Sequence, residues 1–264
     1  MKYVLKHINA KNDAFEQSQM FHYLRSRDAP AEEKLAFAPH MAHFVFSFMD
    51  VNRFVLRDDS DSHPHQQLVN IHTEEDAHHW PWYLQDLEAM GLDPQMRFSE
   101  ALRFVWSDAT VASRMLTYQF CAIALHATPT ERLAIVETVE TTGNSFLNLA
   151  AEISAEVRSE SAGKHIYYGR HHAGCESGHH MGTAGVEELL DAIELAPEER
   201  QRSCATVDRV YALYTAFVDE MYRFATTHSL QALRSDRAFG EQLMPPSGQQ
   251  AMATTPQQAV RTTS

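Results

Sequence analysis

Apolar residues recur three and four positions apart over most of this chain, which is the spacing that places them on one face of an α-helix. No long stretch alternates between apolar and polar positions between turn residues, as a half-buried strand would. We therefore predict an all-α protein, a bundle of seven or eight helices. The expected helices cover roughly residues 12–27, 31–57, 64–90, 97–126, 129–158, 165–182, 186–195 and 198–230.

Proline with nearby acidic residues marks three of the expected helix starts, at Pro30, Pro129 and Pro197. Proline suits a first turn because its missing N–H would find no partner there, and acidic side chains interact favourably with the helix dipole. Gly91 and Gly163 mark two expected helix ends, because glycine readily adopts the left-handed conformation that closes many helices.

The expected helix at 31–57 is apolar around most of its circumference, which is typical of a central helix. His40 and His43 lie on it, either close to a functional site or as core histidines satisfied by hydrogen bonds. The second interpretation is favoured. After about Ser235 the sequence becomes rich in Gly, Pro, Gln, Thr and Ser, with too little apolar area to order itself. We expect one helical domain over residues 1–234 and a flexible tail over 235–264.

The composition of the chain excludes several classes of binding partner. A formal net charge of -13, with no stripe of Lys and Arg, argues against a nucleic-acid partner. The three cysteines are widely spaced and form no CxxC pair, which is typical of reduced thiols rather than a disulfide framework. No apolar run is long enough to cross a bilayer, and the N-terminus lacks the apolar core of a signal peptide. We expect a cytoplasmic protein with no membrane partner.

Histidine is the compositional outlier, with sixteen residues in the chain. In the run 171–180, His172, Glu176 and His179 stand at i, i+4 and i+7, so a helix would project all three from one face. The ordinary alternative is a solvated helix face. Glycines within and just before this run, at 169, 174 and 178, weaken that alternative, because a plain surface helix gains nothing from residues of poor helix propensity. They favour close helix packing or a distorted turn near a metal.

A second run, at 72–79, carries His72 and His79 two helical turns apart. Glu75 lies between them and would either complete a ligand set or orient one of the histidines. The other polar residues of this run are expected to be solvated, namely Glu74, Asp76 and His78.

Glu140 lies on the apolar side of the expected helix at 129–158, whereas Glu137 lies farther around it. A lone carboxylate on an apolar face is unfavourable unless it is paired or bound to metal. Imidazole and carboxylate groups that project from several helices are the ligands that non-haem iron uses in helical bundles. A metal-dependent oxidase is therefore the leading hypothesis.

Other chemistries find less support. The chain has no G-x-S-x-G element for a serine hydrolase, no G-x-G-x-x-G or P-loop for a nucleotide, and no H-E-x-x-H for a zinc protease. A structural zinc site would favour cysteine ligands.

The order and spacing of these residues resemble the haem-oxygenase-like di-iron oxidases and oxygenases, relatives of the thiaminase-II and PQQ-synthase C fold, over about residues 15–230. The family pattern is a ligand-x6-His pair, a glutamate on the next core helix, and His-x3-(Asp/Glu)-x2-His on a third. The matching residues are His72, His79, Glu140, His172, Glu176 and His179. The first position is usually glutamate in the family, whereas this chain has His72, with Glu75 as the alternative ligand.

The resemblance implies a haem-oxygenase-like bundle that binds two Fe(II) ions per chain and uses O2 on a small substrate, amino-acid-like or a fatty acid, in natural-product biosynthesis. The implied reactions are N-oxygenation, oxidative C–C cleavage or nitrile formation, with an external electron donor. We expect aromatic residues to line the substrate pocket, Phe44, Trp82, Tyr167 and Tyr168 among them, and Arg170 to bind a substrate carboxylate. A homodimer is expected.

Two alternatives stay open. One is a metal-independent, thiaminase-II-like hydrolase on the same fold, with Cys175 as its nucleophile. The other is a non-enzymatic metal-binding or scaffold protein.

Overall fold

A computed structural model describes residues 1–158, 163–178 and 190–235, and within these ranges the chain is helical without any strand. The all-α class is therefore confirmed. The tail expected from residue 235 onward lies almost entirely outside the described residues. No described helix combines the length and the apolar character needed to cross a membrane.

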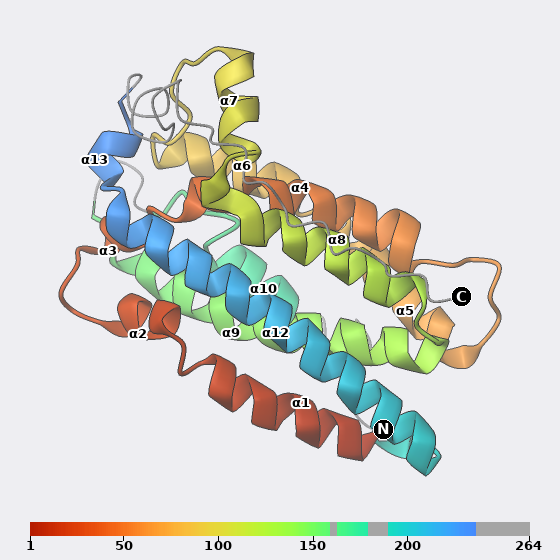
Figure 1. Ribbon diagram of the computed structural model, residues 1–264. Helices are drawn as coiled ribbons and strands as arrows, with labels where there is room; N and C mark the ends of the chain where they lie inside the picture. Colours follow the sequence, from red (N-terminus) through yellow and green to blue (C-terminus); the bar gives the residue numbers. More distant parts are fainter. Residues whose placement is uncertain (159–162, 179–189, 236–264) are drawn as a thin grey trace, which may run out of the picture.

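Two long helices form the centre of the bundle, α9 (Pro129–Glu156) and α12 (Pro197–Thr227), and they pack against each other. Leu133 to Val136 are four consecutive buried residues of α9, so this helix is surrounded on every side there. The first helix, α1 (Lys2–Phe15), packs on both α9 and α12 (Figure 1). These two helices confirm the expected segments 129–158 and 198–230 to within about three residues.

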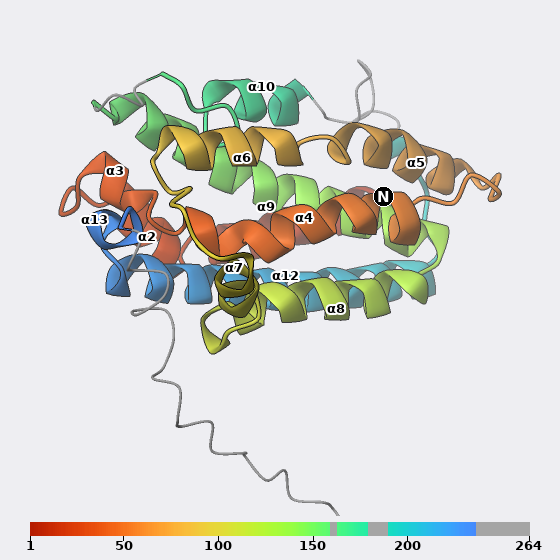
Figure 2. The same cartoon turned by 90° about the horizontal axis from the view of Figure 1, so that it is seen from above.

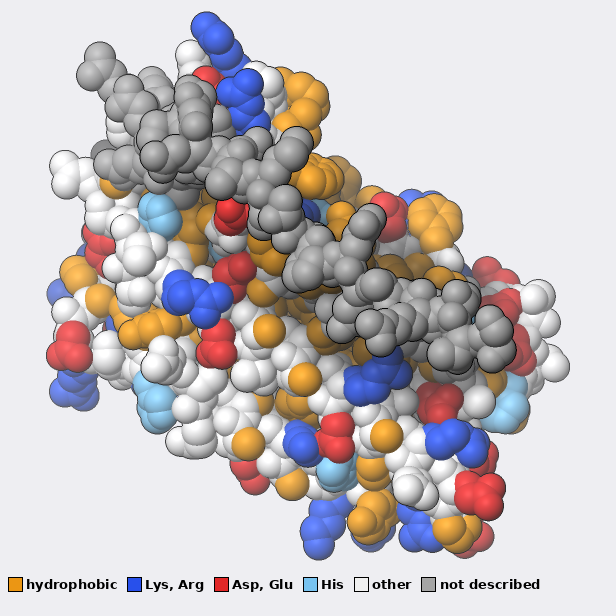
Figure 3. All heavy atoms as spheres, viewed as in Figure 1, with side chains coloured by type: hydrophobic (Ala, Val, Ile, Leu, Met, Phe, Trp, Pro, Cys, Tyr) orange, Lys and Arg blue, Asp and Glu red, His pale blue; other side chains and the backbone are white. Residues whose placement is uncertain are grey.

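The remaining helices pack around α9, and α12 runs along one edge of the bundle in Figure 2. Helices α4 (Ala42–Val51) and α8 (Val111–Leu125) pack on each other, and α8 also packs on α12. Helices α5 (Pro64–Asp76) and α10 (Arg170–Gly178) both pack on α9. The outer elements are the shorter helices α2 (Gln19–Arg25), α3 (Ala31–Lys34), α6 (Trp80–Ala89), α7 (Phe98–Val105) and α13 (Leu230–Leu233). On the face shown in Figure 3, basic and acidic side chains are interspersed rather than gathered into one patch.

Several expected helices are interrupted, and two of the interruptions lie next to proline. The segment 31–57 is not one helix but α3, a 3-10 turn η1 (Ala38–Met41), α4 and a π turn η2 (Asn52–Leu56). The segment 64–90 divides into α5 and α6. Pro39 and Pro81 lack an N–H, and in a continuous helix each ring would clash with the carbonyl four residues earlier. Each proline instead stands in the first turn of a new element.

Other boundaries also differ from expectation. The segment 97–126 is α7, a 3-10 turn η3 (Asp108–Thr110) and α8, with Ser107 capping the turn through its hydroxyl. The expected 12–27 helix is α1 and α2, and α1 begins at Lys2. The expected 165–182 helix begins only at Arg170. Residues 179–189, which include the end of that segment and the start of the 186–195 segment, lie outside the described residues.

Gly91 closes α6 as expected. Its φ of 68° is left-handed, and the backbone N–H of Leu92 donates to the carbonyl of Leu87 at 2.8 Å, while that of Gly91 donates to Glu88 at 2.9 Å. This pair of bonds is a Schellman closure. Gly163 also has a left-handed φ, of 73°.

His40 is a core histidine, as favoured from the sequence. It is fully buried, and its Nε2 lies 2.8 Å from Oε1 of Glu220 on α12. Glu220 also accepts hydrogen bonds from the backbone N–H groups of Ala112 and Ser113, in the first turn of α8. Burial raises the pKa of Glu220, but these hydrogen bonds outweigh burial and hold the pKa below its usual value. Glu220 therefore ties η1, α8 and α12 together.

We expect Glu220→Ala to lower the free energy of unfolding by about 3 kcal/mol at pH 7, because it leaves buried donors without an acceptor. Because the pKa of Glu220 is depressed in the fold, its contribution is fully present above the unfolded pKa and is lost as the pH falls through the folded pKa. The difference between wild type and variant in urea denaturation should therefore shrink below about pH 4. Exposed Glu152→Ala is the matched control, and an equal loss in that variant would contradict the role assigned to Glu220.

Candidate metal centre

Helices α5 and α9 bring one imidazole and two carboxylates together in the core. His72 Nε2 lies 3.0 Å from Asp76 Oδ2 and 3.2 Å from Glu140 Oε1. His72 and Asp76 face the same way because they are four residues apart on α5, and Glu140 approaches from α9. All three are buried, with 1%, 5% and 7% of their surface exposed. One potential ligand atom from each lies within 4.8 Å of the others.

These three groups fit a divalent cation. Two ligand atoms bound about 2.1 Å from one ion at right angles are about 3 Å apart, close to the separations of His72 from its two carboxylates. Even with His72 doubly protonated, two carboxylates and one imidazolium carry a net charge of about -1, which is unfavourable in a buried place. One imidazole with two carboxylate oxygens is a donor set that suits Fe(II) or Mn(II), and also Zn(II).

A pair of histidines lies beside this cluster. His172 Nε2 is 3.1 Å from His79 Nδ1, and His172 Nδ1 is 2.9 Å from the carbonyl oxygen of Tyr167. A carbonyl can only accept, so Nδ1 of His172 carries the proton, and in the neutral ring Nε2 offers a lone pair. The His79 ring stacks on Trp82, with ring centroids 4.6 Å apart. The separation of the two nitrogens also matches two ligands of one ion.

The turn before α10 holds the carbonyl that orients His172. Asp86, fully buried on α6, accepts the backbone N–H groups of Ile166 and Tyr168 at 2.6 and 2.8 Å. Burial raises the pKa of Asp86, and the two backbone hydrogen bonds oppose that rise. Gly169 closes the turn, and a Cβ at this position would lie 2.0 Å from the carbonyl oxygen of His165. A Cβ does not fit there unless the turn shifts, so of the two expected roles for these glycines, Gly169 serves a tight turn.

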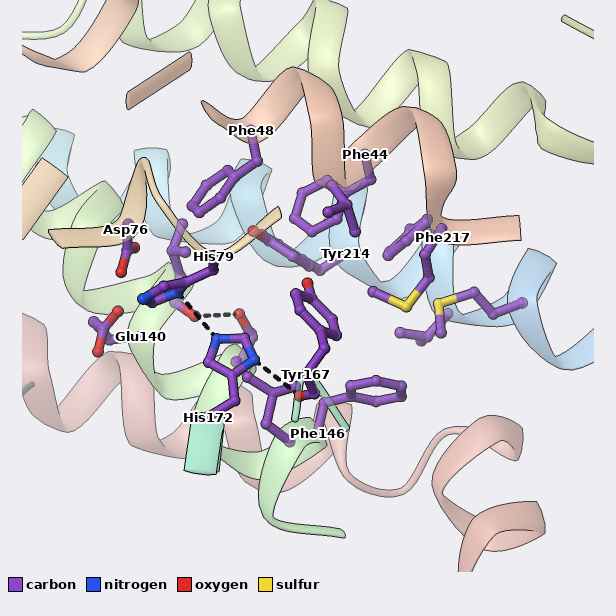
Figure 4. Close-up of a pocket in the computed structure, with 18 of the residues that line it drawn as sticks. Phe44, Phe48, Asp76, His79, Glu140, Phe146, Tyr167, His172, Tyr214 and Phe217 are labelled. Carbon is purple, nitrogen blue, oxygen red and sulfur yellow. Dashed lines mark hydrogen bonds between the residues drawn. The ribbon is translucent and has the colours of Figure 1, made fainter. Parts of the chain in front are cut away.

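A mostly apolar cavity of about 90 Å³ opens beside these groups. Asp76, Glu140, His79 and His172 line it at one end (Figure 4). Helices α4, α9 and α12 supply most of the other walls. The apolar lining residues are Phe15, Met41, Phe44, Val45, Phe48, Met49, Trp80, Val139, Phe146, Leu147, Tyr167, Tyr214, Phe217, Val218 and Met221.

The structure divides the expected ligands into separate groups. His72 and Glu140 lie in the three-residue cluster, and His79 pairs with His172. His72 and His79 do not share a continuous helix, because α5 ends at Asp76 and His79 is the residue just before α6. Glu176 lies in α10, but its side chain is not among those described, and His179 lies outside the described residues.

Asp76 is the residue that the sequence interpretation missed, since it was expected to be solvated and is buried in the cluster. A signal was available, because His72, Asp76 and His79 have the same His-x3-acid-x2-His spacing as His172, Glu176 and His179. Glu74 and His78 are exposed, as expected. Glu75 is half-buried, and among the described residues it does not join the three-residue cluster to which His72 belongs.

The expected substrate contacts are only partly in place. Phe44 and Tyr167 line the cavity, whereas Trp82 packs on the histidine pair. Tyr168 is fully buried beside the cavity wall, and its hydroxyl donates to Met41 Sδ at 3.3 Å. Arg170 is exposed and does not line the cavity, so it is not placed to hold a carboxylate there.

The structure also bears on the expected roles of Gly174 and of the three cysteines. A Cβ on Gly174 would have no atom within 4 Å, so this glycine does not serve close packing of side chains. Cys121 and Cys204 are free thiols, and the side chain of Cys175 is not among those described.

A scan against protein-family models finds no match for this chain, and a search of curated proteins finds none either.

Proposed function

We propose that this protein is an O2-dependent, non-haem di-iron oxidase or oxygenase with a haem-oxygenase-like bundle. The observation that carries the proposal is the buried His72–Asp76–Glu140 cluster beside the His79–His172 pair, at one end of an apolar cavity. An ion site beside an apolar pocket is the arrangement that an enzyme needs to bring an organic substrate to a metal.

The charge of the cluster supports the same proposal. The family that this chain resembles usually has a glutamate as its first ligand, and this chain has His72 at that position. This difference by itself would leave the ligand set with one negative charge fewer. Asp76, one turn further along α5, supplies a carboxylate in its place. Two carboxylates with one histidine suit a hard divalent ion better than a histidine-only set would. We therefore expect an iron held by His72, Asp76 and Glu140 to be retained, although His72 is neutral where the family usually has a glutamate.

When bound, Fe(II) would supply the electrons that reduce O2 and a Lewis acid that polarises the reacting groups. In this scheme Asp76 and Glu140 would neutralise part of the charge of an ion held with His72, and His79 and His172 would hold the adjacent ion. His172 is oriented by its Nδ1 hydrogen bond to Tyr167, in the manner that commonly orients ligand histidines. The aromatic walls exclude water from the substrate side. An external electron donor completes the reaction in this proposal.

The two alternatives explain less of the site. A thiaminase-II-like hydrolase would act through Cys175, and it leaves the buried cluster of two carboxylates and a histidine without a role. A scaffold or storage protein would not need an apolar cavity beside the ligands.

The experiment is anaerobic loading of the full chain with Fe(II), followed by metal analysis and exposure to O2. We expect about two irons per chain, because the cluster and the histidine pair are two adjacent groups of ligands. Rapid mixing with O2 should then produce a transient visible absorption and consume O2. Trace iron after loading would overturn the proposal, and bound iron without reaction with O2 would favour the non-enzymatic alternative.

A further inference from the structure

Asn52 is a polar residue of the core whose hydrogen-bonding groups are unused. It is fully buried, and among the described residues neither its Oδ1 nor its Nδ2 has a hydrogen-bond partner. The buried Asn70 shows the usual case, because its Oδ1 accepts from the backbone N–H of Asp58 and its Nδ2 donates to the carbonyl of Asp58. An amide left unsatisfied in the core lowers stability, so Asn52 needs an explanation.

The backbone is also irregular at this residue. Asn52 begins η2, the π turn that follows α4, and its carbonyl accepts the backbone N–H of Arg57 at 3.2 Å. Turns of this kind are rare and occur frequently at functional sites. A rare turn and an unsatisfied buried amide thus meet at one residue, and such departures from local rules are expected where function requires them.

Helical spacing directs Asn52 toward the cavity. The residues of α4 that line the cavity are Phe44, Val45, Phe48 and Met49. Asn52 stands at i+4 from Phe48 and i+3 from Met49, and its own backbone is still helical, with φ -62° and ψ -47°. It is therefore the next residue of the same helix face, just beyond the lining residues. Figure 4 shows Phe48 at the end of the cavity that carries Asp76 and His79.

The packing of η2 on α5 places Asn52 level with the cluster of His72, Asp76 and Glu140. The carbonyl of Leu56 accepts from Nε2 of Gln66 at 2.8 Å, and α5 runs back along α4 in Figure 2. One turn back from Leu56 therefore corresponds to about one turn forward from Gln66, which is the part of α5 that carries His72.

We propose that Asn52 is a positioning residue of the candidate metal centre, whose amide hydrogen-bonds a water molecule carried by a divalent ion at His72, Asp76 and Glu140. An ion held by three side chains commonly completes its coordination with water. Water bound through its lone pair can donate to Oδ1 of Asn52, and the neutral amide accepts without adding a third negative charge to two buried carboxylates. This inference rests on the metal centre of the proposed function.

Two substitutions at this position should change stability and metal affinity in opposite directions. Asn52→Leu keeps the branched shape of the side chain and removes both unsatisfied groups, so the metal-free protein should unfold at a higher urea concentration. The same variant should bind Mn(II) about 10–100-fold more weakly, as is typical for loss of a residue that supports a metal site. Asn52→Asp keeps the accepting oxygen but buries a charge, so it should unfold at a lower urea concentration without metal and bind Mn(II) at least as tightly as wild type.

Both quantities are measured on the full chain, unfolding by circular dichroism with a chelator present and Mn(II) affinity by the electron paramagnetic resonance signal of the free ion. Asn70→Leu is the control for stability and should lower the urea midpoint, because it leaves the backbone groups of Asp58 without partners. Ser47→Ala is the control for affinity, because Ser47 lies on the side of α4 that contacts α8, with its Oγ 2.7 Å from Thr117 Oγ1.

The inference is overturned if Asn52→Leu binds Mn(II) as tightly as wild type. It is also overturned if both Asn52→Leu and the smaller Asn52→Val destabilise the metal-free protein as Asn70→Leu does, since the amide would then serve the fold alone. In either case metal binding by the wild type leaves the proposed function standing. A wild-type protein that binds neither Mn(II) nor Fe(II) would overturn both.

Discussion

Asp76→Ala should reduce iron from about two ions to about one per chain and abolish O2-dependent turnover. The variant removes one of the two carboxylates that balance the charge of the ion near His72, and its affinity should fall at least about 100-fold, more than for loss of a residue that only orients a ligand. Metal analysis after anaerobic loading and desalting measures the loss directly. Circular dichroism should show unchanged helicity.

Two neighbouring variants sharpen this test. His78→Ala is the control, because His78 is exposed two residues beyond Asp76 and should leave both ions in place. Glu75→Ala tests whether Glu75, rather than Asp76, is the carboxylate on α5 that binds the ion. If Glu75→Ala loses an ion while Asp76→Ala keeps both, Glu75 is the ligand, and the cluster of His72, Asp76 and Glu140 is not the metal site.

Gly169→Ala should destabilise the protein by about 3 kcal/mol and weaken metal binding by the histidine pair. A Cβ at this position would lie 2.0 Å from the carbonyl oxygen of His165, so the turn must move, and forced overpacking typically costs about 1–3 kcal/mol. The same turn carries the Tyr167 carbonyl that holds His172. Loss of such an orienting contact typically reduces metal affinity about 10–100-fold.

Gly174→Ala is the matched control for that variant. This glycine lies in α10, and a Cβ there meets no atom within 4 Å. Replacing a helical glycine by alanine should stabilise the protein, by up to about 1 kcal/mol. Urea denaturation measures both variants, and competition with a metal chelator measures their iron affinity. Equal behaviour of the two variants would show that the turn at 165–169 does not constrain the site.

The sequence by itself determined the all-α class, the two long core helices and several residues of the candidate site. Amphipathic spacing reports directly which side of a helix is buried, so α9 and α12 could be read from one chain without any partner. Glu140 could be identified for the same reason, since a carboxylate on an apolar stripe requires a charged or metal partner. The Gly91 closure was also evident, because glycine is the residue that the left-handed position favours.

Tertiary structure decided how the candidate ligands group. Helical spacing placed His72 and His79 on one face. Because Pro81 stands in the first turn of a new helix, α5 does not continue as far as His79. His79 instead lies against His172 of α10. Asp76 was expected to be solvated although its spacing from His72 and His79 repeats that of the 172–179 run, and the approach of α9 buries it beside His72 and Glu140. Spacing within a helix is a local property, whereas the separation of side chains on α5, α9 and α10 depends on how these helices pack. The cavity and the exposure of Arg170 likewise depend on how several helices pack together, which cannot be read from the sequence of any one of them.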